Sequence, residues 1–156
     1  MPSPYINDHA ARAETAGALA RLLADSYTLA LKLQGFHWNV VGPHFHSLHE
    51  FFQTEYTEIT AAIDEFAERI RALGVKAPAS FSEFAELRSI NDETGALSAE
   101  AMIRELLSDH SIVARTALQV VTMAEAHGDA ATADIATQYV TKREKAAWML
   151  DSLLQR

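Results

Sequence analysis

Residues 46–74 read HSLHEFFQTEYTEITAAIDEFAERIRALG, and this stretch carries the clearest structural pattern in the chain. Its large apolar side chains recur at steps of three and four residues, which is the spacing along one face of an α-helix. The positions on this face are Leu48, Phe52, Tyr56, Ile59, Ile63, Phe66, Ile70 and Leu73. Gly74 follows, and glycine readily adopts the left-handed conformation that ends many helices. We therefore predict a long amphipathic helix from about His46 to Leu73.

The same periodicity predicts three further long helices. We expect them from about Asp8 to Phe36, from Ser98 to Gly128, and from a capping Asp129 onward. On the last two of these helices the pattern places Leu118 and Leu153 among the inward-facing positions. Ala and Leu dominate the apolar residues, and both favour helices over strands. The sequence therefore predicts an all-α protein.

The connections predict how these helices are arranged. A tight loop from His37 to Pro43 joins the first two helices, and a short link joins the last two, so each pair is antiparallel. The link from Val75 to Leu97 can cross the whole bundle, and it carries a short helix capped by Ser80 or Ser82. This order predicts a ferritin-like four-helix bundle with one long crossover carrying a short helix, as a single domain over residues 1–156.

Composition and charge exclude several classes of function. The chain has 156 residues, no cysteine and a formal net charge of −8. It therefore has no disulfide, thiolate metal site or thiol nucleophile, which fits a reducing cytoplasm. We see no secretory signal in the segment Met1 to Ala11 and no apolar run that could span a membrane, so we expect a soluble protein. Such an acidic chain attracts cations and repels nucleic-acid backbones.

Histidines and acids cluster along one part of the sequence. Four of the seven histidines lie between His37 and His49. On the following helix, His49, Gln53, Asp64 and Glu68 share a narrow strip beside the apolar face, because a helix turns by about 100° per residue. His49 and Asp64 are roughly 22 Å apart along the axis, whereas metal ligands lie at about 2.0–2.3 Å from an ion. Two antiparallel copies of the helix across a two-fold axis could bring them together, which predicts a metal site shared between subunits.

The ligand types narrow the choice of metal. Histidine and carboxylate ligands without sulfur suit Fe(II), Mn(II) or Zn(II). By residue type and spacing alone, an exposed charged face is an equal alternative, with Glu65 and Arg69 paired along the helix. His44 and His46 are candidates for a secondary metal position, while His9, His110 and His127 are expected at the surface or in packing.

The sequence around this strip resembles the Dps family, the DNA-binding proteins from starved cells, also called mini-ferritins. The matching positions are His37-Trp38-Asn39-Val40, Gly42, Phe45, Leu48-His49, Phe52, Tyr56, Asp64, Ala67-Glu68-Arg69-Ile70, Leu73-Gly74, Gly128-Asp129, Thr132-Ala133-Asp134 and Lys145-Ala146-Ala147-Trp148-Met149-Leu150. The resemblance implies four-helix subunits assembled as a hollow dodecamer, with ferroxidase sites at the two-fold interfaces.

The resemblance also implies a chemistry. His37 and His49 of one subunit, with Asp64 and Glu68 of its mate, would be both the iron ligands and the catalytic residues. A cytoplasmic enzyme of this family oxidises Fe(II), preferably with hydrogen peroxide and otherwise with dioxygen, and stores ferric mineral, which protects against oxidative damage. Zinc is a further candidate for the same site.

Three other positions matched by the resemblance have two interpretations each. Trp38 is either an electron donor beside the site or a buried aromatic anchor. Asp129 and Asp134 either line an acidic three-fold pore that draws in Fe(II), or they cap the last helix and favour its dipole.

The sequence departs from the family pattern at two places. Many relatives carry Asp or Glu four residues after the second histidine, and this chain has Gln53, so the second iron position should bind more weakly. Neither Glu50 nor Glu55 lies on the same strip. The lysine-rich tail of DNA-binding members is also missing from the segment Met1 to Ala11, so we expect weak or absent DNA binding.

Other classes of function remain as alternatives. An ordinary ferritin or bacterioferritin is disfavoured, because no helix carries the Glu-x-x-His motif of those bundles. A DNA-compacting shell with little ferroxidase activity and a zinc-binding shell are the two remaining alternatives, and both would be homo-oligomers.

Overall fold

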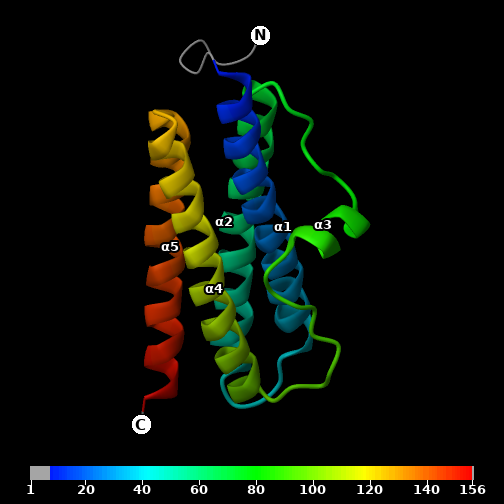
Figure 1. Cartoon of the computed structure of the whole chain (residues 1–156). Helices are drawn as coiled ribbons and strands as arrows, with labels where there is room; N and C mark the ends of the chain where they lie inside the picture. The colour runs from blue at the N-terminus through cyan, green and yellow to red at the C-terminus, as the bar shows by residue number, and fades with distance from the viewer. Residues whose placement is uncertain (1–7, 156) are drawn as a thin grey trace.

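The computed structural model describes residues 8–155, which form five helices and no strand within that range. The helices are α1 (His9–Asn39), α2 (Phe45–Ala72), α3 (Phe81–Leu87), α4 (Ala99–Ala126) and α5 (Ala130–Leu154). The four long helices lie side by side, and α3 lies against α1 within a crossover that runs from one end of the bundle to the other (Figure 1). The predicted all-α ferritin-like bundle with one long crossover is confirmed. The expectations about the opening segment concern residues 1–7, which lie outside the described range.

Serine side chains cap the N-terminal ends of α3 and α4. Ser80 begins α3, because its hydroxyl accepts a hydrogen bond from the backbone N–H of Glu83, whose carboxylate in turn accepts from the Ser80 hydroxyl. Ser98 caps α4 in the same way through the N–H of Ala101. These bonds satisfy N–H groups that have no partner in the first turn of a helix.

The first helix ends later than expected. His37, Trp38 and Asn39 were predicted in the loop, but they form the last turn of α1. Gly35 does not end the helix, since it keeps an ordinary negative φ, and the Asn39 side chain donates to the Gly35 carbonyl at 2.8 Å. The chain turns only after Val40, at Gly42 with φ of 120°. The position of His37 is therefore fixed by a helix rather than by a loop.

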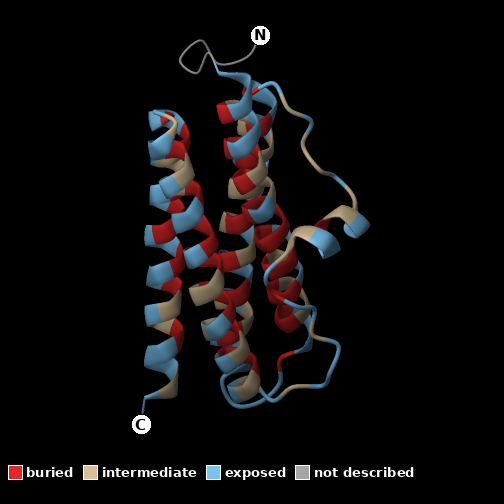
Figure 2. Cartoon of the chain, viewed as in Figure 1, coloured by how far each residue is buried: buried red, intermediate tan, exposed pale blue. Residues whose placement is uncertain are grey.

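The core runs along the whole bundle between the long helices (Figure 2). The stripe predicted on α2 faces inward, with Phe52, Ile59 and Ile70 fully buried. Two predictions at the outer helices are wrong: Leu118 is 47% exposed and Leu153 is 51% exposed. Ala117, directly before Leu118, and Leu150, about one turn before Leu153, are the buried residues at these places.

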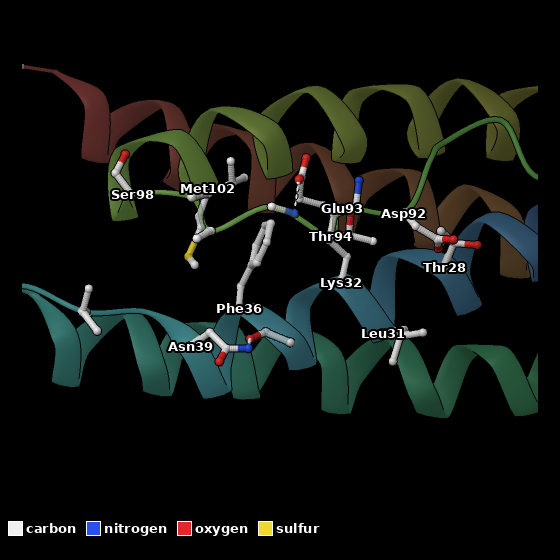
Figure 3. Close-up of a pocket in the computed structure, with 15 residues that line it drawn as sticks. Thr28, Leu31, Lys32, Phe36, Asn39, Asp92, Glu93, Thr94, Ser98 and Met102 are labelled. Atoms are coloured by element: carbon white, nitrogen blue, oxygen red, sulfur yellow. Dashed lines mark hydrogen bonds between the residues drawn. The ribbon is translucent and has the colours of Figure 1, made fainter.

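The crossover is attached to the bundle by a buried carboxylate. Asp25 of α1 is fully buried and accepts hydrogen bonds from the backbone N–H of Ser89 and from the Thr116 hydroxyl, at 2.5 and 2.7 Å. Beside this attachment, a hollow of about 870 Å³ lies between α1 and the crossover, and Figure 3 shows Phe36 of α1 reaching into it. No helix of the described residues is long and apolar enough to cross a membrane.

Candidate metal centre

The structure brings His37 and His49 into direct contact. Their imidazole rings stack at 3.7 Å between centroids, with only 13° between the ring planes. The Nδ1 of His37 lies 2.6 Å from the carbonyl oxygen of His49, and the Nδ1 of His49 lies 2.7 Å from the carbonyl oxygen of His37. A carbonyl oxygen can only accept, so each Nδ1 carries the proton and donates it. Each Nε2 therefore keeps a free lone pair, which is the form of histidine that binds a metal ion.

Two further rings border this histidine pair. Phe45, the first residue of α2, stacks on His49 with the ring centroids 5.0 Å apart. Tyr56 meets His37 edge-on at 5.5 Å. The two imidazoles thus lie between aromatic side chains, and their orientations are restricted on both sides.

The carboxylates of the predicted site are exposed on the same face of α2. Glu68 lies about one turn and Asp64 about two turns before the C-terminal end of the helix, and both side chains are open to solvent. Within residues 8–155 of a single chain, no three histidine or carboxylate side chains converge on a common point. The structure therefore joins the two histidines and leaves the two acids apart from them.

Gln53, His44 and His46 lie close to His49 in the sequence, at the start of α2. Gln53 is exposed one turn after His49. His44 and His46 are also exposed, and they border a shallow hollow with Glu50, whose carboxylate is 3.6 Å from the His46 ring. Trp38 is 62% exposed, so it is not a buried anchor within its own chain.

The two aspartates with pore and capping interpretations differ in the structure. Asp129 is 2% exposed, accepts from the backbone N–H of Thr132 at 3.0 Å, and pairs with the Arg69 guanidinium at 2.8 Å. It is the N-cap of α5, and its oxygens are bound within the chain. Arg69 thus pairs with Asp129 rather than with Glu65. Asp134 is exposed and accepts a hydrogen bond from the Gln138 side chain, one turn away on α5.

Sequence reasoning missed a buried charged cluster in the middle of the bundle. Arg143 of α5 is fully buried among Glu55, Glu58 and His110. Burial is the main cause that raises the pKa of Glu55, and burial followed by the Arg143 charge lowers the pKa of His110 well below 6.5. A signal for this cluster existed in the sequence: Glu55, His110 and Arg143 each fall on the apolar stripe of their own helix.

Comparisons with known proteins agree with this architecture. The model of the family described as the ferritin-like domain matches residues 16–156. DNA protection during starvation protein 2 of Bacillus anthracis is 37% identical over 138 residues, which cover 88% of this chain and 94% of that protein. The Dps protein of Bacillus brevis has a solved structure with 34% identity and a TM-score of 0.90, covering 94% of this chain and 98% of that one. The Dps protein of Vibrio cholerae O1, described as a ferritin-like diiron-carboxylate protein, is 29% identical with a TM-score of 0.92, covering 99% of this chain and 100% of that one.

Proposed function

Since this chain belongs to the Dps family of ferritin-like proteins, we propose that it oxidises Fe(II) at sites shared by two subunits and stores the ferric product inside a shell of identical chains. The observation that carries this proposal is the histidine pair, whose two Nε2 atoms are free while both Nδ1 atoms are held by backbone carbonyls. Hydrogen peroxide as oxidant, a shell of twelve subunits and a cytoplasmic setting belong to the same proposal.

The proposed site combines His37 and His49 of one subunit with Asp64 and Glu68 of the next. His49 and the two acids are too far apart along one α2 to share an ion, although they lie on the same strip of that helix. An antiparallel neighbour related by a two-fold axis would place its acids opposite the histidines and create two equivalent sites. Two imidazoles and two carboxylates provide the ligand types that iron accepts.

We propose that each site holds two ions, one facing each imidazole ring. Lone pairs of nearly parallel imidazoles do not converge on one point, so each ring would face its own ion. Ions in two-metal sites lie about 3.5–4 Å apart, and the centroids of the two stacked rings lie 3.7 Å apart, which supports two neighbouring ions. Two Fe(II) ions each give one electron to hydrogen peroxide, whose O–O bond breaks to form two water molecules with the uptake of two protons. A paired delivery of electrons avoids the hydroxyl radical that a single electron would release.

Iron oxidation by purified variants tests the site. Fe(II) is added without oxygen, peroxide is then added, and ferric absorbance is followed. The double variant His37→Ala, His49→Ala should lose the fast phase of oxidation. The variant His44→Ala, His46→Ala is the matched control, because it removes two exposed histidines close by in the sequence and should retain that phase. Equal rates in the wild type and the first variant would show that the site lies elsewhere.

Mixing two inactive variants tests whether the site is shared. One variant lacks the histidines, and the other carries Asp64→Ala with Glu68→Ala. When the two are unfolded and reassembled together at equal amounts, half of the two-fold pairs are mixed, and each mixed pair contains one intact site. We therefore expect about a quarter of the wild-type activity to return. No recovery, with shells reassembled normally, would mean that the four residues do not act across an interface.

A further inference from the structure

Large apolar side chains are exposed on and around α1. Of the nine such side chains among the described residues, six lie on α1, at its junction with α2, or on α3. At about 200 Å² for a whole aromatic side chain, the exposed parts of the four rings among them amount to roughly 440 Å². This is about half of the roughly 800 Å² that each partner contributes to a stable interface. The six residues are Tyr27, Leu31, Trp38, Val41, Phe45 and Phe81.

Five of these side chains form one continuous surface. Phe81 of α3 meets Tyr27 of α1 edge-on, with the ring centroids 6.5 Å apart. Both rings line a hollow of about 390 Å³ together with Leu31, and Leu31 also borders the larger hollow, where Val41 lies. Trp38 shares the strip of α1 that carries Tyr27 and Leu31, because steps of four and eleven residues keep the same side of a helix within about 40°. We call these five residues the α1–α3 face.

The α1–α3 face carries both protruding side chains and recesses. Phe81 is 75% exposed and Trp38 is 62% exposed, while the hollows beside them measure about 390 and 870 Å³. A two-fold interface uses the same surface of both partners, so each copy has to offer protruding groups and the space that receives them. The shape of this face therefore suits a second copy of the same chain.

The exposed residues in the middle of α2 also permit the close approach of a second copy. A two-fold axis that places His49 opposite Asp64 and Glu68 passes α2 about half-way between them, roughly 12 Å along the helix from His49. None of the exposed side chains between Gln53 and Asp64 carries a charge, and all are small. They are Thr54, Thr57, Thr60 and Ala61.

The same axis meets α1 at the α1–α3 face. His37 lies beside His49, and α1 and α2 are antiparallel neighbours (Figure 1). A distance of roughly 12 Å back along α1 from His37 therefore leads to Leu29. Tyr27 and Leu31, the exposed apolar residues of the face, lie two residues to either side of it. The position that the metal centre requires for the axis thus coincides with an exposed apolar surface.

We propose that the α1–α3 face docks on the same face of a second copy, across the two-fold axis that completes the metal centre. Each copy then covers Tyr27 and Leu31 of the other, and the crossover helix α3 is part of the subunit interface together with α1 and α2. The inference rests on the proposed shared site for the position of the axis, whereas the exposed apolar face is a separate observation.

Two leucines with the same exposure provide a matched test. Leu31 and Leu118 are each 47% exposed. Leu31→Glu should weaken subunit association at least tenfold, because the axis brings the substitution into the interface twice and each carboxylate loses water there. Leu118→Glu adds the same charge outside the face and should assemble like the wild type. Sedimentation velocity over a range of concentrations measures association, and circular dichroism checks folding. Wild-type assembly of Leu31→Glu, or an equal loss in both variants, would overturn the inference.

Mixing opposite charges tests whether the occupant is a second copy. Leu31→Lys alone should also fail to assemble, but a mixture with Leu31→Glu should recover assembly, because unlike charges then meet near the axis. A mixture that stays dissociated would overturn the inference, since the face would then belong to a different partner or a different interface.

Assembly is measured without iron, so it can be separated from the proposed oxidation. The double variant His37→Ala, His49→Ala should remain assembled. If Leu31→Glu stays assembled and oxidises iron, the docking surface is wrong and the proposed function stands. If Leu31→Glu dissociates and recovers with Leu31→Lys, while the wild type does not oxidise iron, the docking surface stands and the proposed function is wrong.

Discussion

His37 and His49 each donate from Nδ1 to the backbone carbonyl oxygen of the other, at 2.6 and 2.7 Å. The last turn of α1 and the first turns of α2 are therefore joined by two reciprocal hydrogen bonds. These bonds fix the tautomer of both rings and leave both Nε2 atoms free. In metal sites, the partner of the second ring nitrogen commonly orients the ligand and raises its basicity. Here the backbone carbonyl of each histidine orients the imidazole ring of the other.

Phe45→Ala should weaken metal binding at the histidine pair without unfolding the chain. The ring of Phe45 stacks on His49 and restricts the rotation of its imidazole. Without that ring the imidazole has more conformational entropy, and metal binding has to overcome the loss of this entropy. We expect a loss of affinity for Co(II) on the order of threefold to tenfold, equivalent to about 1 kcal/mol. Phe45→Tyr should retain the affinity. Phe81→Ala removes another exposed phenylalanine ring, in the crossover helix α3, and an equal loss there would contradict the role of Phe45.

Gln53→Glu should strengthen the second metal position. The exposed amide of Gln53 lies one turn after His49 on the same strip and carries no charge. A carboxylate at this place adds a negative charge close to the proposed ions, and we expect on the order of a tenfold gain in affinity for the second ion. The number of Co(II) ions bound per chain at fixed free Co(II) measures the effect. Thr54→Glu adds the same charge at a neighbouring exposed position and should give a smaller gain; equal gains would indicate a general charge effect.

Asp129→Ala should destabilise the fold by about 2–3 kcal/mol. The change removes both the N-cap of α5 and the partner of the Arg69 guanidinium. Asp129→Asn keeps an acceptor for the cap and should cost about half as much. Denaturant unfolding followed by circular dichroism measures the difference. Asp134→Ala, at an exposed position on the same helix, should stay within about 0.5 kcal/mol of the wild type.

His110 should make the fold sensitive to mild acid. Burial, followed by the charge of Arg143, lowers the pKa of His110 well below 6.5 in the folded chain, whereas an unfolded histidine titrates near 6.5. Below that pH the unfolded state binds more protons than the folded state. The free energy of unfolding therefore falls as the pH is lowered below 6.5, by up to about 1.4 kcal/mol per pH unit. Above pH 6.5 this contribution is fully present.

His110→Gln should remove this slope. Unfolding free energies between pH 7 and pH 5 are compared by their dependence on pH rather than by their absolute values, because the substitution also changes the contact with Arg143. His46→Gln, at an exposed position, should keep the wild-type slope. An undiminished slope in His110→Gln would assign the acid sensitivity to other groups.

Duplex DNA should not be retarded by this protein at about 0.1 M salt. Its net charge of −8 repels phosphates, and the shell would multiply that charge. A gel shift measures this, with a version that carries six added lysines at its N-terminus as the positive control. Retardation of DNA by the unmodified chain would show a local basic surface that outweighs the net charge.

Periodicity predicted most of the fold because burial along a helix is a local pattern. The stripe from Leu48 to Leu73 lies against the core as expected, and Gly74 ends the turn with a positive φ of 86°. The same reasoning failed at the end of α1. A glycine such as Gly35 is compatible with a helix end but does not force the helix to end. Whether the helix continues depends on the residues against which its next turn can pack. The tertiary contact between His37 and His49 supplied that reason.

The sequence by itself determined which residues are available: a four-helix pattern, histidines beside the start of α2, and acids on the same strip. Only the tertiary structure decided their chemical states. The two imidazoles are stacked, and their Nδ1 atoms donate to backbone carbonyls. Asp129 pairs with Arg69, and Arg143 is buried beside Glu55 and His110. The physical reason is that a charged side chain is solvated by default. Whether it stays in water or enters the core depends on partners from other helices, and residue spacing along a single helix does not specify them.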